Sequence, residues 1–163
     1  MDALEAIRKR RSVRDYTGAP IPREDLETIV DAGRLAASGN NTQPWAFVVV
    51  TRRDLIERLK VASFWMEKAG AIIGVVVDPS SPWWREDGSA AVENMLIAAT
   101  ALGYGSCWLQ GFTMPREEEF KKLLKIPSHK TLLTLVPIGV SVQWPTKEKK
   151  PLAEVLHWER YSR

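Results

Sequence analysis

Three side chains near the N-terminus could together hold an anion. Arg10, Ser12 and Arg14 occupy alternate positions in one short run, directly after the first predicted helix. Alternate residues of an extended chain point to the same side, so two guanidinium groups and a hydroxyl would face one point. Guanidinium binds phosphate through paired hydrogen bonds, and Arg11 adds charge to the run. The pattern is typical of a phosphate site, and equally of a solvated basic helix end.

A second basic run lies close to the C-terminus. Lys147 and Lys149 alternate in the same way, and Pro151 follows them. Two ammonium groups facing one point would strengthen a phosphate site. Taken alone, the run has the composition of a charged surface loop.

Two further segments offer hydrogen-bonding groups without charge. Residues 38–45 form a run of amide, hydroxyl and turn-forming residues between a predicted helix and a predicted strand. In residues 105–112, two glycines bracket an apolar stretch, and glycine allows the backbone to approach a flat ligand closely. Both segments would also suit ordinary turns.

Other kinds of site lack the residues they need. His129 and His157 are the only histidines and Cys107 is the only cysteine, so we predict no metal site and a buried, inert thiol. The two common glycine-rich nucleotide motifs are absent from the sequence. No pair of carboxylates indicates general acid–base catalysis of the hydrolase kind.

The elements that would position these groups are mixed helices and strands. Asp2 is predicted to cap a first helix through Leu4 and Ile7, and Pro22 to open a second. Further helices are predicted after Asp54 as N-cap, over residues 89–102 and over residues 115–124. Strands are predicted over residues 47–50, 71–77, 107–109 and 132–140, with Pro137 marking an edge strand or a bulge. The class is α+β, with a central, mostly antiparallel or mixed sheet flanked by helices.

Size and composition set the frame. The 163 residues suit a single domain over 1–163, with 45% hydrophobic residues and a net charge of +3. The longest apolar runs are too short to cross a bilayer, no signal peptide is visible, and one cysteine fits a reducing compartment, so we predict a cytoplasmic protein that does not bind membranes. Seven tryptophans are many for this length and favour an oligomer with aromatic side chains at its interface.

Taken in order, the four segments resemble the FMN-dependent nitroreductase family. The sequence R-R-S-V-R-D-Y is similar to the family's phosphate-binding opening, and S-x-x-N-x-Q-P-W to its second signature. The segment A-L-G-Y-G-S-C-W-L-Q-G resembles the part of the family that lies beneath the flavin ring, and K-x-K-K-P-L its last basic motif. The ordered set covers nearly the whole chain and is far more specific than any one piece.

The resemblance implies an intertwined homodimer with FMN at the subunit interface and the helix from residue 89 in the dimer core. NADH or NADPH would reduce the flavin at N5 and then leave. A small-molecule oxidant such as a nitroaromatic or quinone would bind in its place, which gives a ping-pong cycle. It implies that one subunit provides the phosphate, pyrimidine and N5 contacts and that the other provides the polar loop. The residues so implied are Arg10, Arg11, Ser12, Arg14, Gln110, Gly111, Lys147 and Lys149 from one subunit, and Ser38, Gly39, Asn41 and Gln43 from the other.

Two alternatives remain open at this point. The same fold could carry another flavin reaction, such as dehalogenation or flavin breakdown, because the region at residues 64–68 lacks the asparagine-and-lysine pair that many members direct at the flavin, and no role is assigned to Lys68. The basic runs could instead bind nucleic acid, but no recognised binding motif accompanies them and acidic residues balance the charge. We therefore expect no nucleic-acid partner.

Overall fold

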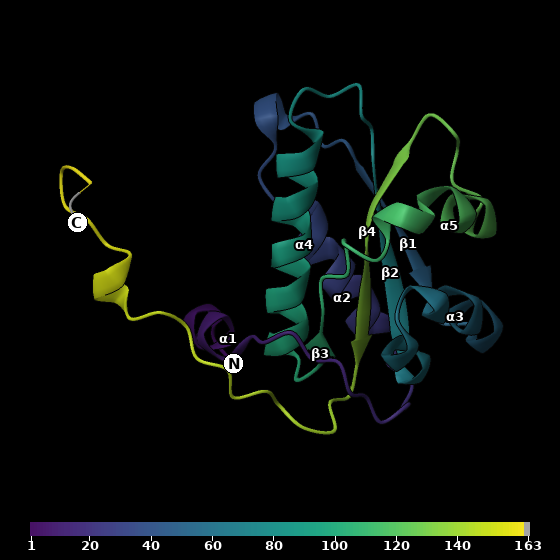
Figure 1. The fold of residues 1–163 in the computed structure, drawn as a ribbon, viewed down its shortest axis with the longest axis horizontal. Coiled ribbons are helices and arrows are strands. Elements are labelled where there is room, and N and C mark those ends of the chain that lie inside the picture. The colour runs from purple at the N-terminus through teal and green to yellow at the C-terminus, as the bar shows by residue number, and fades with distance from the viewer. Residues whose placement is uncertain (162–163) are drawn as a thin grey trace.

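The protein is built on a four-stranded antiparallel sheet. In the computed structural model, which describes residues 1–161, the strands are β1 (Trp45–Val50), β2 (Ala71–Val77), β3 (Gly105–Ser106) and β4 (Thr131–Gly139). Their order across the sheet is β1-β2-β4-β3, and all three neighbouring pairs are antiparallel. The expected α+β class with a mostly antiparallel sheet is confirmed (Figure 1).

Helices cover both faces of this sheet. On one side, α2 (Arg23–Arg34) and α4 (Trp84–Ala101) pack over Ile73 and Val75, whereas α3 (Arg53–Leu59) and α5 (Glu117–Leu124) cover Ile72 and the opposite face (Figure 1). The short helix α1 (Ala3–Lys9) lies against α4. Five short 3-10 turns complete the fold: η1 (Gly39–Asn41), η2 (Lys60–Ala62), η3 (Phe64–Lys68), η4 (Met114–Arg116) and η5 (Leu152–Glu154).

The amino-acid pattern explains these layers. All seven residues of β2 are buried, as an apolar strand with neighbours on both sides and helices on both faces requires. Asp2 accepts a hydrogen bond from the Glu5 amide at 2.9 Å, so the predicted cap of the first helix is confirmed. Helix α2 places Leu26 and Ile29 in the core and its charged residues outside.

Helix α4 begins five residues earlier than predicted, at Trp84 rather than Ser89. Gly88, a residue that usually disfavours helix interiors, lies inside it. A Cβ atom at Gly88 would lie 2.5 Å from the Leu133 side chain, so only glycine allows the helix this close to β4. Glu86 and Asp87 then fall in the first turn, where the helix dipole favours negative charge.

Three other predictions about the elements were wrong. Asp54 lies inside α3, whose N-cap is Arg52, because its carboxylate pairs with the Arg52 guanidinium at 2.6 Å instead of capping. Residues 107–109 do not form a regular strand: β3 ends at Ser106, and only Leu109 makes a further bridge, to Leu135.

Pro137 lies in an inner strand rather than at an edge, and the register shift in β4 occurs elsewhere, opposite Val75 and Val76. Ile138 directs its carbonyl toward the Gly70 amide, so Pro137 faces the other way, toward the short strand β3. The missing N–H of Pro137 therefore costs little, because its neighbour on that side is only two residues long.

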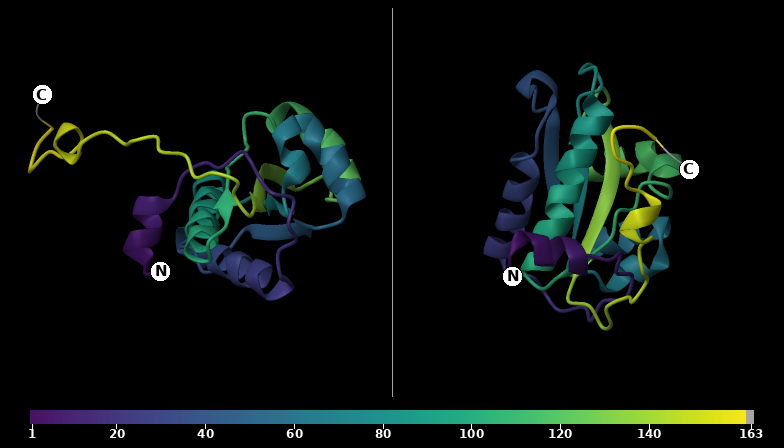
Figure 2. Two further views of the ribbon diagram at one scale, coloured as in Figure 1. Left: turned by 90° about the horizontal axis from the view of Figure 1, so that it is seen from below. Right: turned by 90° about the vertical axis from the view of Figure 1, so that its left-hand side faces the viewer.

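The last part of the described chain leaves the body of the molecule. After β4 the chain passes beneath the sheet and extends as an arm over residues 145–161 (Figure 2). Large apolar side chains on this arm are exposed, with Leu152 at 70%, Trp158 at 75% and Tyr161 at 84%. Single exposed apolar side chains are ordinary, but a run of them on an extended arm indicates a surface that another chain covers.

Candidate functional site

The N-terminal basic run is held against the end of the sheet by its backbone. The Val13 amide donates to the Ser106 carbonyl at 2.9 Å and the Thr17 amide to the Val140 carbonyl at 2.9 Å. Val13 is fully buried, and a Cβ atom at Gly105 would lie 2.7 Å from it. Glycine at position 105 thus lets this segment approach the strand, and the buried Val13 fixes which way its neighbours point.

The three alternate residues of the run are brought together around Cys107. Burial raises the pKa of the Cys107 thiol, while the charges of Arg14 and Arg10 and the hydroxyl of Ser12 act on it in the opposite direction. Ser12 and Arg14 also line one pocket, whereas Arg10 pairs with Glu93 of α4. The thiol itself is buried and kept protonated, in agreement with its predicted inertness.

Arg11 points elsewhere and has a different environment from the one predicted. Its Nε donates to the main-chain carbonyl of Lys147 at 2.8 Å, and its Nη1 donates to the carbonyls of Arg8 and Arg10, each at 2.8 Å. These three bonds engage the guanidinium with the chain itself. Arg11 therefore joins the second basic run to the first, because it fixes the backbone at Lys147 beside the segment at 10–14.

Arg10 has a partner that the sequence did not indicate. Its Nε lies 3.1 Å from Oε1 of Glu93 in α4, and its side chain is only 18% exposed. Glu93 is half-exposed, so the pair is partly screened by solvent. The ion pair orients the Arg10 guanidinium and also competes with any anion for it.

The N-terminal basic run and the segment that precedes the second basic run border a common pocket. Ser12, Arg14 and Asp15 line it from the N-terminal side, and residues 143–146 line it from the other, around a volume of about 410 Å³. Lys147 follows directly in the chain, and both Lys147 and Lys149 are exposed. Cation-bearing residues from the two ends of the sequence thus lie next to one another at the lower end of the sheet in Figure 1.

Gln110 and Gly111 follow Cys107 on the same side of the molecule. The Gln110 carbonyl accepts hydrogen bonds from the amides of Thr113 and Met114, both at 3.0 Å. Among the hydrogen bonds of residues 1–161, none uses the amides of Gln110 or Gly111 as donors. A Cβ atom at Gly111 would meet nothing within 4 Å, so this stretch of backbone borders open space.

The polar loop at residues 38–43 is ordered by hydrogen bonds of its own. The Ser38 hydroxyl accepts from the Gln43 amide at 3.1 Å, and the Gly39 amide donates to Asp87 of α4 at 2.9 Å. Asn41 and Gln43 have positive φ angles of 55° and 47°, a region that few residues other than glycine adopt. The exposed amides of this loop are therefore held in a defined arrangement.

The two halves of the predicted site do not meet within one chain. The polar loop sits beside the N-terminal end of α4, whereas the basic run passes near the other end of that helix (Figures 1 and 2). Arg10 meets α4 at Glu93 and Gly39 meets it at Asp87, so the two halves contact the same helix at different positions.

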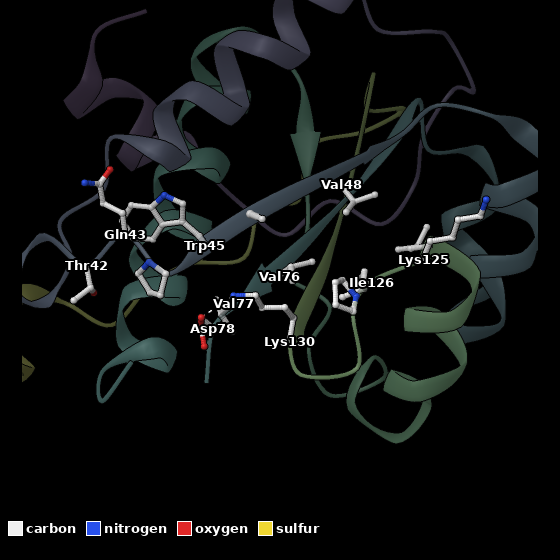
Figure 3. A pocket seen from close by; sticks show the side chains of 14 residues that line it. Thr42, Gln43, Trp45, Val48, Val76, Val77, Asp78, Lys125, Ile126 and Lys130 are labelled. Atoms are coloured by element: carbon white, nitrogen blue, oxygen red, sulfur yellow. Dashed lines mark hydrogen bonds and ion pairs between the residues drawn. The ribbon is translucent and has the colours of Figure 1, made fainter. Parts of the chain in front are cut away.

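A separate pocket of about 420 Å³ opens between β1 and the end of α5. Figure 3 shows Asp78 and Lys130 meeting in it, with their charged atoms 2.6 Å apart, while the Gln43 amide points away from them. The Lys130 ammonium lowers the pKa of the Asp78 carboxyl, with help from the Ser80 hydroxyl. Of the predicted site residues, only Gln43 lines this pocket.

Two carboxylates contact the predicted site residues although sequence reasoning missed them. Glu93 and Asp87 both lie on α4, and each meets its partner, Arg10 or Gly39, across at least 48 positions of sequence. The late predicted start for α4 placed Asp87 outside the helix altogether. In residues 1–161, no group of three histidine, cysteine or acidic side chains is arranged to hold a metal ion.

The chain is similar to known proteins over most of its length. The nitroreductase family model matches residues 7–72 and 61–140, which is more than half of the chain. The chain belongs to the nitroreductase family. A relative from Archaeoglobus fulgidus, provisionally named an NADH dehydrogenase/NAD(P)H nitroreductase, is 39% identical over 159 residues that cover 91% of this chain and 88% of the relative.

Solved structures of other nitroreductases have the same fold. A protein from Bacteroides thetaiotaomicron with the same provisional name superposes with a TM-score of 0.90 at 30% identity, over 98% of each chain. A nitroreductase with bound FMN from Bacteroides fragilis gives a TM-score of 0.81 at 28% identity, over 96% of this chain and 98% of that one. The predicted family and the predicted oxidoreductase class are confirmed. Within residues 1–161, no helix of this nitroreductase is long and apolar enough to cross a membrane.

Proposed function

We propose that this nitroreductase binds FMN between two copies of the chain and uses NADH or NADPH to reduce nitroaromatics, quinones or related small acceptors. The observation that carries the proposal is the placement of Ser12 and Arg14 in one pocket with residues 143–146, directly before the second basic run, where Arg11 binds the Lys147 carbonyl. The bound FMN of the Bacteroides fragilis relative supports the choice of cofactor.

The residues present fit the phosphate end of FMN. Arg10 and Arg14 supply two guanidinium groups, Ser12 supplies a hydroxyl, and Lys147 and Lys149 stand in the adjacent segment. A phosphate monoester carries close to two negative charges at neutral pH, which such a set of donors would balance. In this account Arg11 serves the site indirectly, because its bonds hold the two segments together.

The residues also fit a flat ring at the other end. The amides of Gln110 and Gly111 border open space without partners among the hydrogen bonds of residues 1–161. The ring nitrogen of Trp108 and the hydroxyl of Ser106 are buried without a hydrogen-bond partner in the same part of the chain. Unpaired buried donors of this kind are costly and call for a ligand, a water or a second subunit.

Two features support the homodimer. In residues 1–161 the polar loop makes no hydrogen bond to the basic run of its own chain, and the family resemblance implies that Ser38, Gly39, Asn41 and Gln43 serve the site of the partner. The exposed apolar side chains of the arm at 145–161 have no core within their own chain to cover them. A second copy would bury both surfaces at once.

When bound, FMN supplies hydride transfer between a reduced nicotinamide and an acceptor that visits the same face in turn, which gives ping-pong kinetics. The chain contributes binding and charge. Arg10 and Arg14 hold the anion, the Gln110 and Gly111 amides orient the ring edge, and no side chain is required as a general base. Positive charge near the ring favours negative charge that develops there during reduction.

The proposal is tested with the purified protein. We expect a yellow protein with the absorbance of FMN, bleached by NADH or NADPH and restored by a nitroaromatic or a quinone. A halogenated aromatic acceptor, offered in parallel, tests dehalogenation. A colourless protein that does not take up added FMN would refute the proposal. We place the enzyme in the cytoplasm, where a single unpaired cysteine is ordinary.

A further inference from the structure

We infer that Asp87 is a positioning residue, which holds the polar loop at 38–43 in the shape that meets the flavin of the partner subunit. The inference rests on the proposed function, because it assigns a role to a residue behind the proposed site. Asp87 is 5% exposed, and its carboxylate faces the loop from the first turn of α4.

The polar loop has a backbone that its own sequence does not favour. Asn40, Asn41 and Gln43 all have positive φ angles, of 50°, 55° and 47°. Asparagine tolerates this region better than most residues, but glutamine gains nothing there. Three such residues within four positions persist only when the surroundings fix them.

Asp87 holds this loop from outside, together with the Ser81 hydroxyl, which lies 3.4 Å from the Thr42 hydroxyl. One oxygen of its carboxylate accepts the Gly39 amide at 2.9 Å, and the other lies 3.4 Å from the Thr42 hydroxyl. The two bonds hold both sides of the turn, so the carboxylate bridges it. Helix α4 is the longest in the described chain and eight of its 18 residues are buried, which holds the carboxylate on a packed element.

The Trp83 indole packs against the loop at Gly39. A Cβ atom at Gly39 would lie 2.2 Å from a ring carbon of Trp83, so the ring lies directly against the glycine. The indole limits movement on one side of the loop and Asp87 limits it on the other. Asn40, Asn41 and Gln43 are exposed on the loop that these two contacts hold.

The side chain at position 87 needs an oxygen that accepts the Gly39 amide. The substitution Asp87→Asn would keep one oxygen for the Gly39 amide, while Asp87→Ala would leave that amide without its partner. The test therefore compares these two variants. A control is Asp25→Asn, because Asp25 also accepts a hydrogen bond across to another element, from the Tyr104 hydroxyl at 2.6 Å, but does not contact the loop.

The three variants and the parent protein are titrated with FMN after removal of bound flavin, and amide hydrogen exchange is followed over residues 37–44. We expect Asp87→Ala to weaken FMN binding by about tenfold and to speed exchange at Gly39, as loss of one buried acceptor predicts. Asp87→Asn should restore binding to within about threefold of the parent, and Asp25→Asn should leave it unchanged.

Parental affinity for FMN in Asp87→Ala would overturn the inference, as would an equal loss in Asp87→Asn or in Asp25→Asn. A parent protein that binds no FMN would refute the proposed function instead. In that case the exchange rate at Gly39 still decides whether Asp87 holds the loop.

Discussion

Arg11 and Lys147 are 136 positions apart in sequence, yet the Nε of Arg11 donates to the Lys147 carbonyl at 2.8 Å. The same guanidinium also binds the carbonyls of Arg8 and Arg10. One side chain thus fastens the start of the C-terminal segment to the end of the first helix. The proposed phosphate site depends on this link, because it brings the two basic runs together.

Substitution of Arg11 should therefore weaken the site without removing a direct phosphate contact. We expect Arg11→Ala to raise the Kd for FMN by about tenfold and to lower the free energy of unfolding by about 1 kcal/mol, in line with the loss of hydrogen bonds from a charged donor. Lysine lacks the planar guanidinium that donates to three carbonyls, so Arg11→Lys should bind FMN as weakly as Arg11→Ala. Flavin titration and urea unfolding measure the two effects. Arg34→Ala, which breaks an exposed pair with Asp31, is the control and should change neither.

Removal of the charge on Glu93 should have the opposite effect on binding. Glu93 pairs with Arg10 at 3.1 Å, and Glu93→Gln would release that guanidinium for the phosphate. We expect a Kd for FMN that is lower by about threefold, because a nearby negative charge that opposes the anion is gone. Glu27→Gln removes a carboxylate that pairs with Arg23 on an exposed helix face, and it should leave the Kd unchanged. Weaker binding in Glu93→Gln would show instead that the pair is needed to orient Arg10.

Tyr104 predicts a change of stability with pH. Its hydroxyl donates to Asp25, and this hydrogen bond, followed by burial, raises the pKa of Tyr104 to about 12. A raised pKa means that the folded state favours the protonated phenol. The contribution is complete below about pH 10, near the ordinary tyrosine pKa, and is lost as pH rises toward 12.

Urea unfolding of Tyr104→Phe at several pH values tests this linkage. We expect the variant to be less stable than the parent at about pH 8 and the difference to shrink between about pH 10 and about pH 12. A difference that stays constant over that range would contradict the prediction.

The arm should determine the oligomeric state. Leu152→Ala combined with Trp158→Ala removes two side chains that are 70% and 75% exposed in the single chain. If a partner covers them, the variant should dissociate more readily by at least about tenfold, because buried leucine and tryptophan side chains each contribute more than about 1 kcal/mol. Analytical ultracentrifugation measures the change. Phe64→Ala removes an equally exposed apolar side chain from the body and should not alter the state.

Local sequence patterns predicted most of the fold and part of the candidate site. Alternation predicted that Ser12 and Arg14 share a side, and both line one pocket with the buried Val13 between them. Buried strands such as β2 were visible as unbroken apolar runs. In contrast, Gly88 indicates a helix break until the contact with Leu133 is known.

Contacts between distant elements account for what the sequence did not disclose. Arg11 looked like a third phosphate ligand because its charge is visible in sequence, whereas the carbonyls that engage it are not. Glu93 and Asp87 looked like ordinary helix-surface or loop acids, and only the packing of α4 places them against Arg10 and Gly39. The spacing of residues predicts which side chains point the same way, but it does not predict which distant groups bind them.

The buried Cys107 has a practical consequence. It is the sole cysteine of the chain, the residue is 1% exposed, and its thiol stays protonated. Thiol-reactive dyes and spin labels should therefore leave the native protein unmodified. A single cysteine introduced on the arm or in the polar loop would be the one position that reacts, so distances between labelled copies can be measured without first removing a native cysteine.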